Sequence, residues 1–154
     1  DNCPGQVILS GTKEILETFS KILKEKGART VLPLKVSAPF HCSLMNDASK
    51  KMEGVLSQIN LKKLEAKYIS NVTADFEDNP DRIKELLVKQ IFTRVKWRES
   101  IVKAEKEGAN RFIEVGNGKV LTGMNKRISK DIISENISNM KDIDLFLKNN
   151  KNII

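Results

Sequence analysis

The single histidine of the chain, His41, lies where an extended segment gives way to a helix. It follows Val36–Phe40, in which a proline breaks the extended run, and it precedes an apolar helical pattern that begins near Ser43. Ligand crevices open at the ends of strands in α/β sheets, and histidine is the side chain best suited to move a proton near neutral pH. His41 is therefore a candidate general base. A histidine that is only packed or solvated at a helix start is the alternative.

Gln90 is a polar residue on an apolar helix face. It lies three residues after Leu87 and seven after Ile83, and these positions share one side of a helix. A polar group in such a place needs a hydrogen-bond partner. A purely structural hydrogen bond accounts for Gln90 as well as a functional one does, and the spacing alone leaves both open.

The loop Gly116–Lys119 follows a strand-like run and opens a helix-like one, as phosphate-binding loops do. It lacks the spacing of a Walker loop and the longer dinucleotide fingerprint. We therefore interpret the loop as a tight turn between a strand and a helix, with a phosphate-binding site as the alternative.

The period of the apolar residues switches repeatedly between that of a strand and that of a helix. Thr12 is a possible N-cap, Gly27 is a stop signal, and Asn79-Pro80 is a strong helix start. Helices are expected over 13–26, 43–59, 80–91, 97–107, 120–132 and within 140–154, ahead of a frayed tail, and strands over 6–10, 29–36, 68–72 and 111–115. This alternation of strands and helices predicts an α/β protein.

The composition is that of a soluble globular protein, with 40% apolar and 31% charged residues. No stretch reaches the ~20 apolar residues of a membrane helix, and no signal-peptide pattern occurs. The net charge of +7 attracts acidic partners such as nucleic acid, anionic lipid or an acidic protein, but solvated lysines on helix faces account for most of it.

Two cysteines, Cys3 and Cys42, form neither a disulfide framework nor a metal cluster. We interpret both cysteines as free thiols of a protein in a reducing compartment. We expect the cytoplasm, or an organelle matrix if a targeting segment precedes Asp1. Cys42 is a poor second nucleophile beside His41, because neighbouring side chains point apart.

Five short blocks of the sequence form recognisable motifs. They are Asn2–Gly11 (N-x-P-x-Q-x-V-x-[SA]-G), Val36–Met45 (V-S-x-P-F-H-[SC]-x-L-M), Ile69–Val72 ([IV]-x-N-V), Leu87–Trp97 (L-x-x-Q-[IL] and then V-x-W) and Phe112–Arg127 (E-V-G-x-G-K-V-L-T-G-L-x-K-R). Their order and spacing resemble those of malonyl-CoA:acyl-carrier-protein transacylases, and they cover nearly the whole chain. The chain is similar to the C-terminal half of that acyltransferase domain.

The resemblance implies transfer of a malonyl group from coenzyme A to the phosphopantetheine thiol of acyl carrier protein in fatty acid biosynthesis, through a serine ester and without cofactor or metal. It makes His41 the general base and Gln90 the residue whose main-chain carbonyl orients it. Phe40 resembles the malonyl-selective form of the motif, since its ring would clash with an α-methyl group, at a cost of roughly 1–3 kcal/mol. A core role is the alternative for Phe40. Asn2 is a further substrate-binding candidate.

The resemblance also implies a fold, an α/β-hydrolase-like core with an inserted ferredoxin-like subdomain. Residues 1–36 would be the second part of the small subdomain, 37–138 the C-terminal part of the core, and 139–154 a C-terminal helix and frayed tail. Central strands would then become edges and helix faces would lose their cover. We therefore expect the isolated chain to aggregate or to depend on a partner segment.

The chain departs from the family by lacking the nucleophile. It contains no G-x-S-x-G motif, no glycine/glutamine loop of oxyanion donors and no arginine at the position that binds the malonyl carboxylate. We expect it to be inactive alone, and we expect three partners: a missing N-terminal half, acyl carrier protein and a coenzyme A thioester. A truncated, non-catalytic remnant and a basic binding module stay as alternatives. No membrane is expected, because no apolar stretch is long enough. Nucleic acid is not expected, because no aromatic platform accompanies the basic residues and aromatic residues make up only 5% of the chain.

Overall fold

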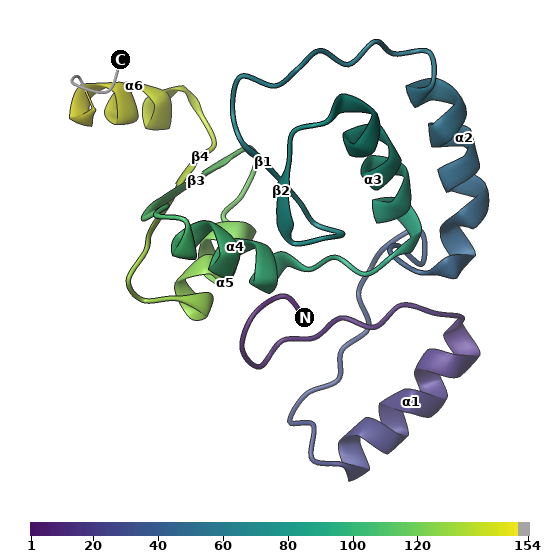
Figure 1. Ribbon diagram of the computed structural model, residues 1–154. Coiled ribbons are helices and arrows are strands. Elements are labelled where there is room, and N and C mark those ends of the chain that lie inside the picture. Colours follow the sequence, from purple (N-terminus) through teal and green to yellow (C-terminus); the bar gives the residue numbers. More distant parts are fainter. Residues whose placement is uncertain (151–154) are drawn as a thin grey trace. The chain divides into compact units, whose positions relative to one another are not determined.

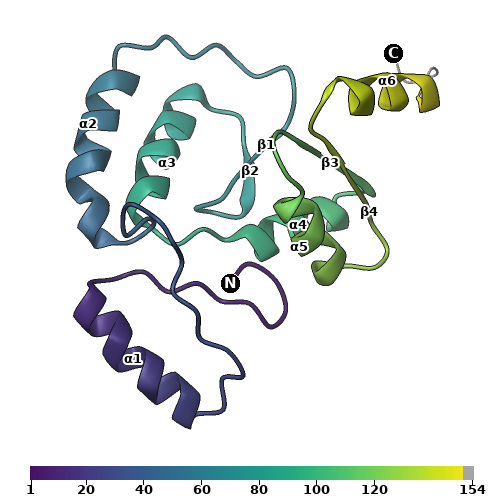
Figure 2. The same cartoon turned by 180° about the vertical axis from the view of Figure 1, so that it is seen from behind.

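The computed structural model describes residues 1–150, which form two compact units (Figure 1, Figure 2). One unit is Val7–Lys96, and the other joins Asp1–Gln6 to the chain from Trp97 onward. In chain order the elements are α1 (Lys13–Glu25), the 3₁₀ turn η1 (Ser43–Met45), α2 (Asn46–Leu56), β1 (Tyr68–Ser70), β2 (Asp75–Glu77), α3 (Pro80–Phe92), α4 (Trp97–Lys106), β3 (Arg111–Val115), α5 (Val120–Ile128), β4 (Ile133–Ile137) and α6 (Met140–Asn149). None of the helices within residues 1–150 has the length and apolar character to cross a membrane.

Helix α3 is the centre of the unit formed by residues 7–96. Its side chains Ile83 and Leu86 are buried, Leu86 to 1% exposure, and α2 packs alongside it. The hairpin of β1 and β2 pairs antiparallel, with Ser70 opposite Asp75, and β1 also contacts α3. The unit therefore has α3 between a helix and a small sheet.

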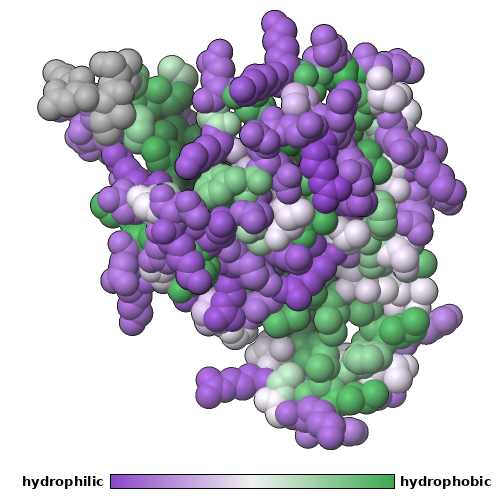
Figure 3. Space-filling model, viewed as in Figure 1, coloured by the Kyte–Doolittle hydropathy of each residue, from purple (hydrophilic) through white to green (hydrophobic). Residues whose placement is uncertain are grey.

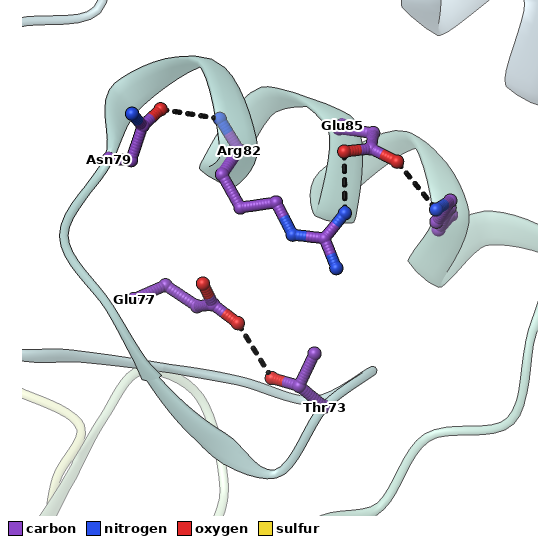
Figure 4. A network of polar contacts seen from close by, with 6 residues as sticks. Thr73, Glu77, Asn79, Arg82 and Glu85 are labelled. Atoms are coloured by element: carbon purple, nitrogen blue, oxygen red, sulfur yellow. Dashed lines mark hydrogen bonds and ion pairs between the residues drawn. The ribbon is translucent and has the colours of Figure 1, made fainter.

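The start of α3 forms as Asn79-Pro80 predicts. The Asn79 side chain accepts a hydrogen bond from the main-chain N–H of Arg82, and proline occupies the first turn. Arg82 and Lys89 then hold the carboxylate of Glu85 from both sides, at 2.6 and 2.5 Å (Figure 4). The hydrogen bonds from Lys89 and Arg82 lower the pKa of Glu85, but solvent screens these exposed pairs, so they add little to stability.

The strands predicted over 6–10 and 29–36 are wrong for the described chain. Residues 7–10 and 29–36 run without a β-ladder, and Gln6 makes only an isolated bridge with Cys3. A strand needs the N–H and C=O groups of a neighbouring strand, and no other segment of residues 1–150 offers them to these two. Apolar residues recur in both segments, but residues 1–150 contain no strand that pairs with them.

Helix α1 has an exposed apolar face. Thr12 caps it by accepting from the N–H of Ile15, and Gly27, at φ +92°, follows its end, as the sequence predicts. Ile15 is 54% and Phe19 is 49% exposed, and no residue of the helix is buried. Figure 3 shows apolar side chains gathered over this helix and the segment that follows it. Such a face is unusual for a protein surface and calls for a partner.

The second unit contains a parallel pair of strands. β3 pairs β4 with Arg111 opposite Ile133 and Val115 opposite Ile137, and α5 contacts both strands. A helix was predicted to continue to Ile132, but α5 ends at Ile128 and the chain turns into β4. The prediction failed because β4 is polar along much of its length, so local apolar periodicity does not indicate a strand there. The strand is defined by its pairing with β3.

A buried polar chain ties α4 to α5 and β4. The indole N–H of Trp97 donates to the Asn125 side-chain oxygen at 3.1 Å, and the Asn125 amide donates to the Ser134 hydroxyl at 3.3 Å. Asn125 and Ser134 are buried, so these hydrogen bonds offset the cost of removing both groups from water. The predicted C-terminal helix is present as α6, and residues 151–154 of the predicted frayed tail lie outside the described residues.

The apolar face of α1 is expected to make the isolated chain self-associate. Phe19→Lys should shift the chain toward monomer, because burial of apolar area between chains stabilises association by about 25 cal/mol per Å². Size-exclusion chromatography with light scattering measures the mass. Thr18→Lys, which adds the same charge at a neighbouring polar position of α1, is the control and should leave association unchanged. A monomeric, cooperatively melting sample of the unaltered chain would contradict this prediction.

Candidate active site

His41 is held in an uncommon backbone conformation. Its φ is +61°, and Ala74 is the only other non-glycine residue with positive φ among residues 1–150. Bulky residues in this left-handed region are strained, and they persist only where the surroundings hold them. The main-chain N–H of His41 donates to the carbonyl of Ile91 at 3.2 Å, which is one of the contacts that hold it.

The imidazole ring of His41 is anchored at one nitrogen. Nδ1 lies 2.7 Å from the main-chain carbonyl oxygen of Gln90, a residue 49 positions away in the sequence. A carbonyl oxygen only accepts hydrogen bonds, so Nδ1 carries the proton and the lone pair of the neutral ring is on Nε2. The ring is thus oriented as a base.

The end of α3 makes these carbonyls available. The last carbonyls of a helix have no partner within it, and they carry the negative end of the helix dipole. Thr93 adopts extended angles, φ −116° and ψ 164°, and ends α3 after Phe92. The carbonyls of Gln90 and Ile91 are therefore left for His41, one for its ring and one for its backbone.

The Gln90 side chain does not take part in this contact. The residue is half-buried, and its amide makes no hydrogen bond to another residue of 1–150. The position of Gln90 on the apolar face suggested a buried side chain that needs a hydrogen-bond partner. Because Gln90 is partly exposed, its side chain does not need a buried partner. Only its main-chain oxygen meets the histidine.

Phe40 and Cys42 flank the histidine in different ways. The Phe40 ring centroid is 6.5 Å from that of His41 at an interplanar angle of 50°, and Phe40 is 43% exposed, so it is not a core side chain of its unit. The thiol of Cys42 is turned to the carbonyl of Pro39 at 3.2 Å. Cys42 therefore does not approach the imidazole as a second reactive group.

Asn2 belongs to the other compact unit. Its main-chain N–H donates to the carbonyl of Gln6 at 3.1 Å in a short loop around the buried Cys3. The loop is held to α5 by Arg127, whose guanidinium donates to the carbonyl of Pro4 at 2.6 Å. The substrate-binding role of Asn2 stays a prediction.

A hollow of about 640 Å³ lies between α2 and α3 and is lined by polar, charged and apolar side chains of both helices. Lys50 and Glu53 line it from α2, and Lys84 and Glu85 line it from α3. His41 is exposed and is not among the lining residues. This hollow is therefore not a cleft beside His41.

The loop Gly116–Lys119 is a strand-to-helix turn whose helix end is already occupied. The Glu114 carboxylate accepts hydrogen bonds from the main-chain N–H groups of Leu121 and Thr122, at 3.1 and 2.7 Å, and from the Thr122 hydroxyl at 2.7 Å. Burial works against the charge on Glu114, but these bonds outweigh it and lower its pKa. An internal carboxylate takes the place that a phosphate would need.

The described residues contain no group of three or more histidine, cysteine, aspartate or glutamate side chains placed to hold a metal ion.

Comparison with known proteins covers almost the entire chain, although no family model matches it. The malonyl CoA-acyl carrier protein transacylase of Bacillus subtilis is 40% identical over 147 residues, which are 96% of this chain and 46% of the relative. The enzyme of the same name from Escherichia coli K12 is 40% identical over 127 residues, 82% of this chain and 41% of the relative. The chain spans about half the length of the curated relatives it matches.

Solved structures agree with these relatives. An acyl carrier protein S-malonyltransferase from Vibrio cholerae superposes with a TM-score of 0.90 at 35% identity, over 95% of this chain and 48% of that one. The chain belongs to the malonyl-CoA:acyl-carrier-protein transacylase family. A malonyl-transacylase in complex with a type II PKS acyl-carrier protein superposes at 0.91 and 34% identity, over 97% and 48%. The chain therefore has a mixed α/β fold that matches about half of such a structure.

Of the predicted site residues in this member of the transacylase family, the structure brings His41, Phe40 and the carbonyl of Gln90 together. Their catalytic roles stay predictions. The sequence analysis missed Ile91 and Thr93, which respectively bind the His41 backbone and end α3. Ile91 makes its contact through the main chain, which does not depend on side-chain type. The one available signal for both residues was their place shortly after Gln90 at a helix end.

The Glu114 cap is expected to make stability depend on pH. Its folded pKa is below the unfolded value, so its stabilising effect is present above the unfolded pKa near 4.3 and is lost as pH falls through the folded pKa. At pH 7, Glu114→Gln should lower the free energy of unfolding by about 1 kcal/mol, typical of a lost helix cap. The difference should vanish in acid.

Urea unfolding followed by the fluorescence of Trp97, the single tryptophan, measures this difference. Glu65→Gln is the control, because that exposed carboxylate has no hydrogen bond or ion pair with residues 1–150. A Glu114→Gln deficit that is equal at pH 7 and at low pH would contradict the capping role of the charge.

Proposed function

We propose that this chain supplies the general base of a malonyl-CoA:acyl-carrier-protein transacylase in fatty acid biosynthesis. The enzyme would move a malonyl group from coenzyme A to the phosphopantetheine thiol of acyl carrier protein. The observation that carries the proposal is the 2.7 Å contact between Nδ1 of His41 and the Gln90 carbonyl, because it leaves Nε2 as the proton acceptor.

The proposed chemistry has two balanced halves. Nε2 of His41 takes the proton of a serine hydroxyl as the serine oxygen attacks the malonyl thioester; the C–S bond breaks, and the proton leaves with the coenzyme A thiol. In the second half Nε2 takes the proton of the carrier's thiol, and the sulfur attacks the serine ester. The ester C–O bond breaks as the new thioester forms, and the serine oxygen recovers the proton from Nε2. The Gln90 carbonyl holds Nδ1–H and stabilises the positive ring between these steps, as aspartate does in other serine enzymes.

The serine must come from outside these residues, since the chain contains no G-x-S-x-G motif. We propose that a segment equivalent to the unmatched part of the relatives supplies it, with the oxyanion donors and the arginine for the malonyl carboxylate. The exposed apolar face of α1 and the unpaired segments 7–10 and 29–36 support such a partner. From the family resemblance we further propose an α/β-hydrolase-like core and a ferredoxin-like subdomain, with boundaries at 1–36, 37–138 and 139–154.

Acyl carrier protein is the proposed protein partner. A transacylase that superposes on this chain was solved with an acyl-carrier protein, and the net charge of +7 suits an acidic surface. We further propose the cytoplasm or an organelle matrix as the location, because the thiols of Cys3 and Cys42 are free.

Reconstitution tests the function directly. The chain is mixed with the part of the Bacillus subtilis relative that it does not match, and malonyl transfer to acyl carrier protein is followed by mass spectrometry. The assembled pair should transfer malonyl, whereas the chain alone should form no malonyl adduct. His41→Ala should reduce kcat of the pair on the order of 10⁶-fold, the size seen for the histidine of subtilisin.

Cys42→Ala is the matched control for His41→Ala, because it changes the next side chain, whose thiol is turned to Pro39. Its rate should stay near that of the unaltered pair. A co-eluting pair with intact His41 that transfers nothing would favour the reading of a non-catalytic remnant. A malonyl adduct on the chain alone would contradict the proposed division of the two catalytic groups.

Phe40 is proposed to set the preference for malonyl over α-methylated acyl groups. Phe40→Ala should lower the ratio of kcat/KM for malonyl-CoA to that for methylmalonyl-CoA by roughly 10- to 200-fold, because a methyl-sized clash would be relieved. Competition between the two thioesters in the reconstituted pair measures the ratio. Phe76→Ala, on the β1–β2 hairpin where Lys67 lies over the ring, is the control. An unchanged ratio in Phe40→Ala would contradict the role.

A further inference from the structure

Three successive carbonyls at the end of α3 have different partners. The carbonyl of Lys89 accepts twice from Thr93, from its main-chain N–H at 3.0 Å and from its hydroxyl at 2.8 Å. The next carbonyl, of Gln90, meets the ring of His41, and the one after it, of Ile91, meets the His41 N–H. Thr93 thus closes the helix at the last carbonyl before the two that hold the histidine.

A longer helix would take both carbonyls away from His41. In a continuing α-helix the N–H of Arg94 would bond to Gln90 and the N–H of Val95 would bond to Ile91. Thr93 prevents this by its extended angles, which suit a β-branched residue. Beyond it the N–H of Lys96 donates to the carbonyl of Asn71 at 2.8 Å, which holds the departing chain beside the end of β1.

We propose that Thr93 is a positioning residue for His41, acting through the carbonyls of Gln90 and Ile91. Its hydroxyl stays on the Lys89 carbonyl and fixes where α3 ends, and this directs the following two carbonyls at the histidine. The importance of this position for catalysis rests on the proposed function, but the effect on the ring does not require any transfer. Thr93 is half-buried and lies in the same compact unit as His41.

The single histidine makes the ring observable. The chain is labelled with ¹⁵N-histidine, alone or bound to the unlabelled complementary segment, and long-range ¹H–¹⁵N correlations report which ring nitrogen carries the proton. We expect the Nδ1–H form in the unaltered chain. Thr93→Val keeps the shape but removes the hydroxyl, so the ratio of Nδ1–H to Nε2–H forms should fall about fivefold, the effect of one net hydrogen bond.

Three variants make the result specific. Thr93→Ser, which keeps the hydroxyl, should restore the ratio, and Thr93→Ala should lower it as Thr93→Val does, which keeps the test available if the valine variant does not fold. Thr18→Val is the matched control: Thr18 makes the same bond to a carbonyl four residues earlier, in α1 at 3.0 Å, and its loss should leave the ring unchanged.

The outcomes separate this inference from the proposed function. An Nδ1–H ring in the unaltered chain that persists in both Thr93→Val and Thr93→Ala would overturn the role of Thr93 and leave the proposed function standing. A predominantly Nε2–H ring in the unaltered chain would overturn both. Reconstituted Thr93→Val should also lose kcat with little change in KM, and recovery by Thr93→Ser should follow the tautomer ratio.

Discussion

A helix must find donors for its last carbonyl groups, and in this chain His41 supplies two of them. The carbonyls of Gln90 and Ile91 accept from the ring and the backbone of one residue that is 49 and 50 positions earlier in the sequence. The contact therefore has one effect on the helix and one on the histidine. It completes the C-terminus of α3, and it fixes the orientation of an exposed imidazole that would otherwise rotate freely.

Several other features of this unit hold α3 and His41 in the positions that the contact needs. Buried Leu86 and Ile83 hold α3 against its neighbours, Asn79 fixes where the helix begins, and Thr93 fixes where it ends. His41 itself adopts a left-handed φ of +61°, a strain that is tolerable because both its N–H and its ring have partners. Backbone strain at a residue with a reactive side chain is a known feature of functional sites.

The same chain has surfaces that its own residues do not cover. An apolar face of α1, two extended segments without a ladder and a two-stranded parallel sheet are all unusual in an isolated domain, because parallel sheets are normally buried on both faces. Val115 of β3 is 79% exposed. The chain spans about half of its relatives, and the proposed partner segment would supply both the cover and the nucleophile.

Features that depend on neighbours along the chain could be predicted from the amino-acid sequence. Asn79-Pro80 placed the start of α3, Thr12 and Gly27 bounded α1, and the run Arg111–Val115 was recognised as a strand. Five motifs also determined the family, and through that resemblance the carbonyl of Gln90 was expected to face His41.

Features that depend on distant partners became clear only from the three-dimensional structure. The strands predicted at 6–10 and 29–36 have no ladder, and β4 was missed although it pairs with β3 along its whole length. The contact of Ile91 with His41 could not be predicted either, because main-chain groups are the same for every residue type. The hydroxyl of Thr93 could be linked to His41 only once the end of α3 and the histidine were seen together. Strand pairing and carbonyl direction are set by which segments meet in space, and periodicity along one segment carries no information about the other.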